Sequence, residues 1–180
     1  AHGSGRGIQG INLADSLNVC DELLIKHGGH KAAAGLTIKT VNIPKFAKQF
    51  NEYACDHLSD EDLVPKVNLD FEVRMPHLTL ETVDQLHLLE PFGADNPPAR
   101  LSIRNLALRR SPDLIGKEKN HIKLFVTDGR QTVEAIGWGM SEHFIVLKNK
   151  NIRLNLAFEP EINEWNDIRR LQLKITDLHI

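Results

Sequence analysis

Apolar residues of the N-terminal segment recur every three or four positions from Leu13 onwards. This spacing predicts a helix from Leu13 to His27 with one apolar face. Asn12 stands before it as a candidate N-cap, with Asp15 three residues later in the place of a weakened capping box. Gly28 is placed where a left-handed residue would end the helix.

The next part of the pattern predicts a short strand and a second helix. Leu36–Ile38 reads as a strand that begins from the small residues before it. A helix follows from Pro44 to His57, with proline at its first position and one apolar face, formed by Phe46, Phe50, Tyr53 and Ala54. In contrast, Gly3–Gly7 is too rich in glycine for a helix or a strand interior and is expected to form a loop.

Residues 59–66 form the best candidate for a domain boundary, because they are polar, acidic and include Pro65. After them the hydrophobic period changes to two, and Val67–Val73 reads as a half-buried strand. A short helix from Leu80 to Leu89 is predicted, with Thr79 as its N-cap. Residues 90–98 contain three prolines and a glycine, which predicts an ordered turn.

The rest of the chain reads as β-structure with one short helix, Ser141–Leu147. Asp128-Gly129 predicts a tight hairpin turn, and Asn163–Asp167 predicts a longer one. Five or six strands with an intervening helix suit a small barrel of the OB type. We therefore predict an α/β unit over residues 1–58, a linker over 59–66 and a mainly β OB-type barrel over 67–180. The candidate strands are Leu101–Leu108, His121–Thr127, Thr132–Trp138, Ile152–Phe158 and Ile168–Thr176.

Composition narrows the class of protein. The chain is 41% hydrophobic and 26% charged, as in ordinary globular proteins. It has no apolar run near the roughly 20 residues of a bilayer span, and its first ten residues lack the apolar core of a signal peptide. We expect a soluble cytoplasmic protein that does not bind membranes. Cys20 and Cys55 fall at apolar positions of the predicted helices and are expected to be buried free thiols.

Charge is unevenly distributed, although the net charge is only −2. Residues 56–95 hold ten acidic and two basic side chains, whereas residues 100–130 hold eight basic and three acidic ones. A near-neutral total can therefore hide a basic face on the second domain, although ordinary scatter of surface charge would also give such counts. The acidic stretch cannot lie along a nucleic acid, so we expect it on an outer face or at a contact with a partner protein.

Two short motifs have the chemistry of phosphate binding. Gly3-Ser4-Gly5-Arg6 offers close backbone approach, a hydroxyl donor and a guanidinium fork, although such glycine-serine runs are also common in plain loops. In Gly28-Gly29-His30, two glycines and the alanines that follow would let a phosphate or sugar lie against the backbone beside the imidazole. A lone histidine is more often structural, but this setting favours a binding role.

These motifs and several later ones occur in an order that resembles the RecJ family of exonucleases, within the DHH phosphoesterase superfamily. The Gly-Gly-His motif alone would indicate only the superfamily, and the Leu-Glu-Pro-Phe-Gly signature followed by an OB-like segment narrows it to RecJ. The resemblance covers nearly the whole chain. It rests on residues 3–6, 28–35, 89–97, 121–124, 135–139 and 171–177.

The resemblance implies roles for single residues. Residues 1–58 would be the C-terminal part of a DHH-associated substrate-binding domain, giving a partial α/β domain before the barrel. Ser4, Gly5 and Arg6 would bind phosphate near the 5′ end of single-stranded DNA. Gly28 and Gly29 would line the same pocket, with His30 near the scissile phosphate. Single-strand-binding protein or other repair proteins are further candidate partners.

The resemblance also implies two-metal phosphodiester hydrolysis, with Mn²⁺ or Mg²⁺ held by a DHH domain. This sequence has no Asp-His-His motif, and its nine histidines are scattered, so we expect no metal site here. The opening glycine-rich loop is an odd start for a domain, and we expect that an N-terminal part has been removed. On this view the parent is a 5′-to-3′ exonuclease of recombination and repair, and the piece alone is inactive.

The OB segment supplies a second group of candidates. Basic residues there could follow a DNA backbone, and Phe125 and Trp138 could stack on bases, although Phe125 is expected in the core. Leu89 and Phe92 are expected to plug the seam between the short helix and the barrel. The candidate DNA-binding residues are Arg100, Arg104, Arg109, Arg110, Lys117, Lys119 and Lys123.

Two other functions remain open at this point. A related DHH phosphoesterase acting on short oligonucleotides or cyclic dinucleotides would share the Gly-Gly-His motif, but an OB-like domain argues against it. A non-catalytic module that holds single strands or a protein partner would keep the barrel without any cleavage. An Asp-His-His segment upstream in the full gene would separate the nuclease from the module.

Overall fold

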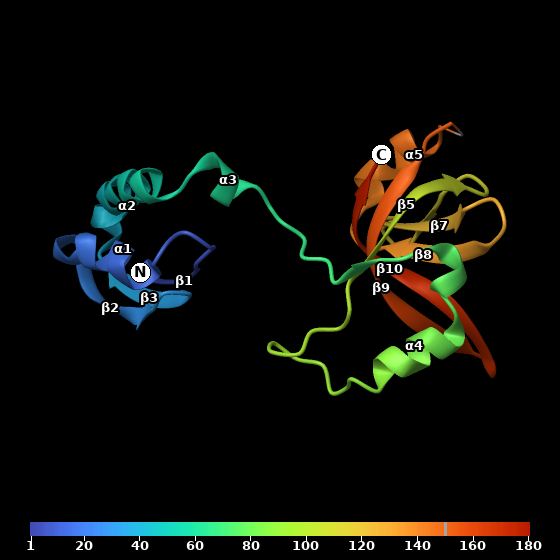
Figure 1. The fold of residues 1–180 in the computed structure, drawn as a ribbon. Coiled ribbons are helices and arrows are strands. Elements are labelled where there is room, and N and C mark those ends of the chain that lie inside the picture. Colours follow the sequence, from blue (N-terminus) through green and yellow to red (C-terminus); the bar gives the residue numbers. More distant parts are fainter. Residues whose placement is uncertain (150) are drawn as a thin grey trace. The chain divides into compact units, whose positions relative to one another are not determined.

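The computed structural model describes residues 1–149 and 151–180, which form two compact units, Ala1–Lys66 and Val67–Ile180 (Figure 1). Each unit has its own hydrophobic core. Residues 60–63 of the predicted linker form a helical turn, α3 (Asp60–Leu63), capped by Ser59. Among the described helices, none is both long and apolar enough to cross a bilayer.

The first unit is a three-stranded antiparallel sheet with two helices on one face (Figure 1). The central strand of the sheet is β3, with β1 and β2 at its edges. Helix α1 packs against the sheet, and α2 packs against α1. The elements are β1 (His2–Arg6), α1 (Leu13–Val19), β2 (Leu24–His30), β3 (Ala33–Ile38) and α2 (Ile43–His57), with 3-10 turns at Asp21–Leu23 and Thr40–Asn42.

The core of this unit is small. Leu13 and Leu17 of α1 meet Ala34 of β3, and the partly buried Phe46 and Phe50 of α2 close it from the other side. Asn12 caps α1 as predicted, since its side chain accepts a hydrogen bond from the amide of Ala14.

Four predictions for this unit are wrong. Gly3–Gly7 is not a loop, because His2–Arg6 pairs along its length with β3, and backbone ladder bonds require no side chains. The predicted helix Leu13–His27 ends at Val19, and its second half is strand β2, because antiparallel pairing with β3 overrides local spacing. Gly28 therefore lies inside a strand and caps no helix. Cys20 is buried as expected, whereas Cys55 is exposed on α2.

The second unit is a β-barrel with two short helical segments. The strands are β4 (Phe71–Glu72), β5 (Leu101–Leu108), β6 (Asp113–Ile115), β7 (His121–Thr127), β8 (Thr132–Gly137), β9 (Leu154–Trp165) and β10 (Ile168–His179). The helices are α4 (Leu80–His87) and α5 (Phe144–Leu147), with 3-10 turns at Met75–His77 and Ser141–His143.

Five of these strands close into a ring in the order β5-β7-β8-β10-β9-β5, in which β8 and β10 run parallel. A bulge makes this closure possible: the register of β5 on β9 shifts between Ile103 and Leu106, where Asn105 has a φ of 58°. The bulge bends β5, so its first half pairs with β9 and its end pairs with β7. This arrangement confirms the predicted OB-type barrel.

The barrel interior is filled by alternating side chains. Ile122, Leu124 and Val126 of β7 are completely buried, as are Leu154 and Phe158 of β9. Helix α4, capped by Thr79 as predicted, contributes the buried Val83.

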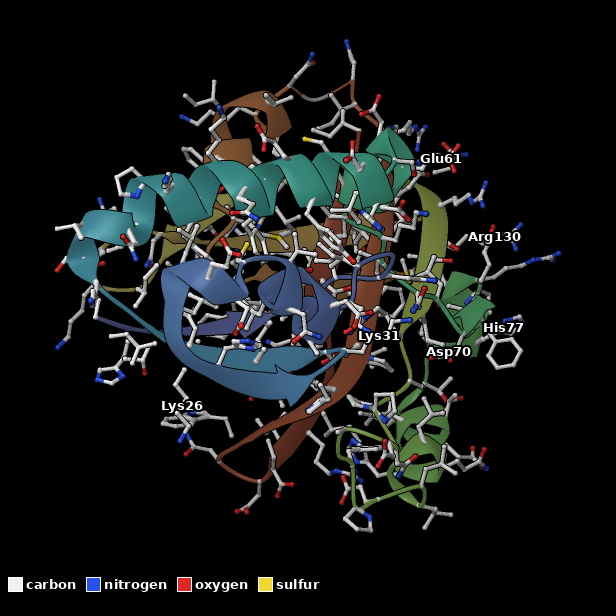
Figure 2. The ribbon with its side chains drawn as sticks, turned by 90° about the vertical axis from the view of Figure 1, so that its left-hand side faces the viewer. Lys26, Lys31, Glu61, Asp70, His77 and Arg130 are labelled. Atoms are coloured by element: carbon white, nitrogen blue, oxygen red, sulfur yellow. The ribbon has the colours of Figure 1, made fainter. Side chains whose placement is uncertain are left out.

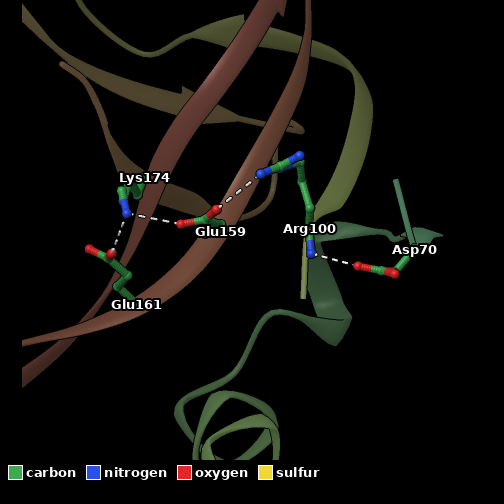
Figure 3. A network of polar contacts seen from close by, with 5 residues as sticks. All are labelled: Asp70, Arg100, Glu159, Glu161 and Lys174. Atoms are coloured by element: carbon green, nitrogen blue, oxygen red, sulfur yellow. Dashed lines mark hydrogen bonds and ion pairs between the residues drawn. The ribbon is translucent and has the colours of Figure 1, made fainter. Parts of the chain in front are cut away.

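A polar network on the outside of the barrel links β9 and β10 to the residues that precede β5 and β4 (Figure 3). Glu159 of β9 binds Arg100 at 3.4 Å and Lys174 of β10 at 2.9 Å, and Lys174 also reaches Glu161 at 3.6 Å. The amide of Arg100 donates to Asp70 beside β4. The hydrogen bond to Glu159 raises the pKa of Lys174.

The second unit also corrects several predictions. Strand pairing in Val67–Val73 is limited to Phe71–Glu72, and Phe71 is 72% exposed, so this strand is not half-buried as predicted. Phe125 is not in the core, since it alternates with the buried Leu124 and points outward. Leu89 is 58% exposed and plugs no seam, whereas Phe92 is partly buried.

The remaining elements lie close to where the pattern placed them. Strands β5 and β7 have the predicted bounds, and the predicted helix at 141–147 divides into a 3-10 turn and α5. β9 and β10 run several residues past their predicted ends. The short strand β6 carried no sequence signal.

Candidate nucleic-acid interface

The two glycine motifs of the first unit meet across the central strand of its sheet. Arg6 and His30 both pair with Ala33, and the next rung joins Gly5, Ala34 and Gly29. The rung after that joins Ser4, Gly35 and Gly28. Segments more than twenty residues apart in the sequence are thus placed on three adjacent rungs of one sheet.

Alternation along the strands divides these residues between the two faces of the sheet. Gly5, Ala34 and Gly29 face α1, since Ala34 is buried and a Cβ on Gly5 would meet Leu13 at 3.5 Å. The opposite face carries Ser4 and Arg6 on β1 and Gly28 and His30 on β2. No element of residues 1–66, all of which the structure describes, covers that face. We call it the open face.

The two adjacent glycines of β2 have different structural roles. Gly29 has a φ of 149°, and a Cβ there would lie 2.3 Å from the carbonyl oxygen of Ala33 and 2.5 Å from the Cα of Ala34. Only glycine fits this position without moving the strand. Gly28 would meet nothing within 4 Å. Its lack of a side chain instead leaves a shallow, exposed floor of backbone on the open face, beside the rung that carries Arg6 and His30.

The polar groups at the Arg6 end are available to a ligand. Among residues 1–149 and 151–180, the Arg6 guanidinium bonds only to the carbonyl of Gly5, at 3.1 Å. The Nδ1 of His30 accepts from the amide of Ala32 at 3.4 Å, which places the proton of a neutral imidazole on Nε2. Ser4 is exposed beside them. Such a set of donors can bind a phosphate group at its oxygens.

A rung that the sequence analysis missed lies further along the open face. His2, Thr37 and Lys26 pair across the three strands. The Thr37 hydroxyl lies 3.0 Å from the Nδ1 of His2. Lys26 and Lys31 are labelled toward opposite ends of the small sheet in Figure 2. Lys26 could have been found only with the register of β2, which the helical prediction concealed.

The second unit has a groove on the outer face of its barrel. Strands β7 and β8 form its floor, and the hairpin between β9 and β10 forms its wall, enclosing about 630 Å³. Strands in these positions, with the loop after the fourth barrel strand, carry the ligand in many OB folds. The lining residues are Lys123, Phe125, Thr132, Val133, Glu134, Asn163, Trp165, Asn166, Ile168, Arg170, Leu171 and Gln172.

Aromatic and basic groups share this groove. Arg110 lies over the Phe125 ring at 4.3 Å, and Lys123 lies 5.5 Å from the same ring. Trp165, near the tip of the hairpin, is 76% exposed, and Arg170 is exposed beside it. Sequence reasoning missed Trp165 and Arg170, because only the extended hairpin brings them to β7.

The other basic candidates are dispersed. Arg100 immediately precedes β5 and Arg104 lies on it, and they form ion pairs with Glu159 and Glu72, away from the groove. Arg109 lies beside a smaller pocket with Leu108 and Lys148.

Two lysines and one aromatic residue lie toward the other end of β7. Lys117 and Lys119 are exposed in the loop before β7. Trp138 is 55% exposed, and its ring meets His121 edge-on at 4.7 Å.

A metal site would require a cluster of acidic, histidine or cysteine side chains. Among residues 1–149 and 151–180, no three such side chains are grouped to hold an ion.

Several known proteins are similar to this chain in sequence. The family described as "RecJ OB domain" matches residues 69–177. The single-stranded-DNA-specific exonuclease RecJ of Bacillus subtilis is 33% identical over 179 residues, covering 98% of this chain and 22% of the relative. Its namesake from Haemophilus influenzae is 29% identical over 180 residues, covering 96% and 31%.

A solved structure shares the fold. RecJ from Thermus thermophilus, in complex with Mn²⁺, aligns with a TM-score of 0.77 at 22% identity, covering 99% of this chain and 25% of that one. This chain thus spans less than a third of the length of each of these relatives.

Proposed function

The chain belongs to the RecJ family and carries its OB domain, and on this premise we propose that it is the substrate-binding portion of a 5′-to-3′ single-stranded-DNA exonuclease. The parent would act in recombination and repair by two-metal hydrolysis, with Mn²⁺ or Mg²⁺ held in a DHH domain outside this chain. We place it in the cytoplasm, with single-strand-binding protein as a candidate partner. The curated relatives are named as exonucleases of this specificity.

The observation that carries the proposal is the meeting of the two glycine motifs on the open face. Arg6 and His30 lie on one rung with exposed donors, and Ser4 and Gly28 lie two rungs away on the same face. Arg6 would bind the phosphate near the 5′ end, and His30 would donate from Nε2 to an oxygen near the scissile phosphate. The floor at Gly28 would let the backbone of the strand approach.

The barrel groove supports the same function from the second unit. Phe125 and Trp165 present aromatic surfaces, and base stacking needs no sequence preference. Lys123 and Arg110, although paired with Glu134 and Asp113, add positive charge at its edge. Such a groove would hold nucleotides of a single strand.

The test is binding of fluorescent single-stranded DNA to this chain at several salt concentrations, with and without Mn²⁺. We expect salt-sensitive binding, with log K falling by about 0.7 per contacted phosphate for each tenfold rise in salt, and no cleavage. The Arg6→Ala variant should bind 5′-phosphorylated strands more weakly, with Lys45→Ala on α2 as a charge-matched control. No binding at low salt would refute the proposal, and metal-dependent cleavage would refute the assignment of chemistry to another part of the parent.

A further inference from the structure

The open face of the small sheet carries two polar ends separated by small residues. One end is the rung of Arg6, Ala33 and His30, which the proposed function uses. The other is the rung of His2, Thr37 and Lys26, which no part of that function uses. The middle rung of this face, between the two ends, consists of Ser4, Gly35 and Gly28.

We propose that the rung of His2, Thr37 and Lys26 is a second phosphate-binding subsite, which holds a phosphate of the same DNA strand further along its backbone. This inference rests on the proposed function of the Arg6 end. It adds that the small sheet binds a chain of nucleotides along its strands and does not recognise the terminal phosphate alone.

Two donors and a hydroxyl that orients one of them lie on this rung. Lys26 is exposed and provides an ammonium group. The Thr37 hydroxyl and His2 Nδ1 are 3.0 Å apart, so a hydroxyl that donates to Nδ1 leaves Nε2–H of His2 free to donate outward. An ammonium and an imidazole N–H on one flat face suit a phosphodiester better than an apolar or cationic ligand, and the Thr37 hydroxyl fixes the orientation of the imidazole.

The charge of the face is not neutralised within the unit. In residues 1–66, all of which are described, the ion pairs are His27–Asp21 and Lys48–Glu52. Neither involves Lys26 or Arg6. The nine positions of the open face contain no Asp or Glu. Uncompensated basic residues at both ends of a surface with a small-residue centre attract an elongated anion.

The spacing of the two ends decides the class of ligand. His2 and Arg6 are four residues apart on β1, which is about 13 Å along an extended strand. One phosphate group cannot reach both ends, so the ligand must carry at least two. The middle rung of Ser4, Gly35 and Gly28 leaves room for the intervening sugar and backbone.

The experiment compares Lys26→Ala, Arg6→Ala and the control Lys45→Ala in the whole 180-residue chain. Affinity is measured for thymidine 5′-monophosphate and for a series of 5′-phosphorylated oligothymidylates. We expect Lys26→Ala to weaken oligothymidylate binding roughly threefold to tenfold and to lower the salt slope by about 0.7, with little effect on the mononucleotide. Arg6→Ala should weaken both kinds of ligand.

The outcomes separate the two proposals. If Arg6→Ala weakens binding while Lys26→Ala matches Lys45→Ala at every length, the second subsite is refuted and the proposed function stands. If the unaltered chain binds none of these ligands, the proposed function falls and the subsite with it. The Thr37→Val variant, which keeps the shape and removes the hydroxyl, should shift affinity in the same direction as Lys26→Ala by a smaller factor.

Discussion

Replacing Gly29 by alanine should destabilise the first unit by roughly 2–6 kcal/mol, because its backbone leaves no room for a Cβ. That atom would lie 2.3 Å from the Ala33 carbonyl oxygen and 2.5 Å from the Ala34 Cα, and both belong to the central strand. Backbone strain at a φ of 149° costs roughly 1–3 kcal/mol, and forced displacement of packed atoms adds roughly 1–3 kcal/mol. A unit of 66 residues has a total stability of roughly 3–10 kcal/mol, so most of it would be lost.

The two cysteines make this loss measurable in the first unit alone. Cys20 is 1% exposed, and burial raises the pKa of its thiol, so it should react slowly with an aromatic disulfide reagent. Cys55 is exposed and should react at once. We expect one fast thiol in the unaltered chain and two in Gly29→Ala. Fluorescence of Trp138 and Trp165, both in the second unit, should be unchanged.

Gly28→Ala is the matched control, one residue away on the same strand. Its Cβ would meet nothing within 4 Å, so its stability should stay within about 0.5 kcal/mol of the original, with one fast thiol. This reasoning would be refuted if Cys20 stays protected in Gly29→Ala and the variant unfolds at the same temperature as the unaltered chain. That result would mean that β2 can shift its register without cost.

Three further results follow from the second unit. Leu154→Ala, at a fully buried position of β9, should lower the free energy of unfolding of the second unit by roughly 2–5 kcal/mol in urea titrations. Cys20 in the first unit should stay protected, and its simultaneous exposure would contradict two separate cores. Trp165→Ala should weaken single-stranded DNA binding by roughly 1–3 kcal/mol in anisotropy titrations, with little loss of stability. Unchanged affinity would show that the hairpin tip does not contact the DNA. The raised pKa of Lys174 means that its pair with Glu159 stabilises the fold at neutral pH and loses this effect as pH rises above 10.5. The stability advantage over Lys174→Met should therefore shrink in alkaline urea titrations, and a constant difference would assign it to packing.

The barrel strands could be predicted from the sequence because their side chains alternate between the interior and solvent. β7 shows this plainly, with Ile122, Leu124 and Val126 inside. The strands of the first unit could not be predicted in this way. β1 is mostly glycine and small polar residues and has no pattern to detect, and the Leu23-Leu24 spacing at the approach to β2 also suits a helix. β1 is held by pairing with residues of β3 that lie 27 to 35 positions away, which is a non-local interaction. β2 pairs with β3 across a two-residue turn, but that turn, Lys31-Ala32, lacks the Gly or Asn that marks a tight hairpin in a sequence.

The candidate site was predictable only in part for the same reason. The two glycine motifs could be recognised because each is a short contiguous segment of the sequence, and the family resemblance implied that they line one pocket. Lys26 and Trp165 belong to no motif. Lys26 depends on the register of β2 with Thr37, and Trp165 depends on how far the β9–β10 hairpin extends past the barrel.

The ring of the barrel is joined very unevenly around its circumference. β9 and β10 share eleven paired positions, whereas β5 and β7 close the ring through only Ala107–Thr127 and Leu108–Val126. The hairpin forms from neighbours in sequence, so it can zip early in folding, and the β5–β7 seam, which joins distant segments, closes late. We expect this seam to open to solvent more readily than the long β9–β10 pairing, so its amides should exchange faster than those of the hairpin. The seam is flanked by Arg109, Arg110 and Phe125. A strand of DNA bound across these residues would stabilise the β5–β7 pairing. Ligand binding would then be visible as slower amide exchange along one edge of β5.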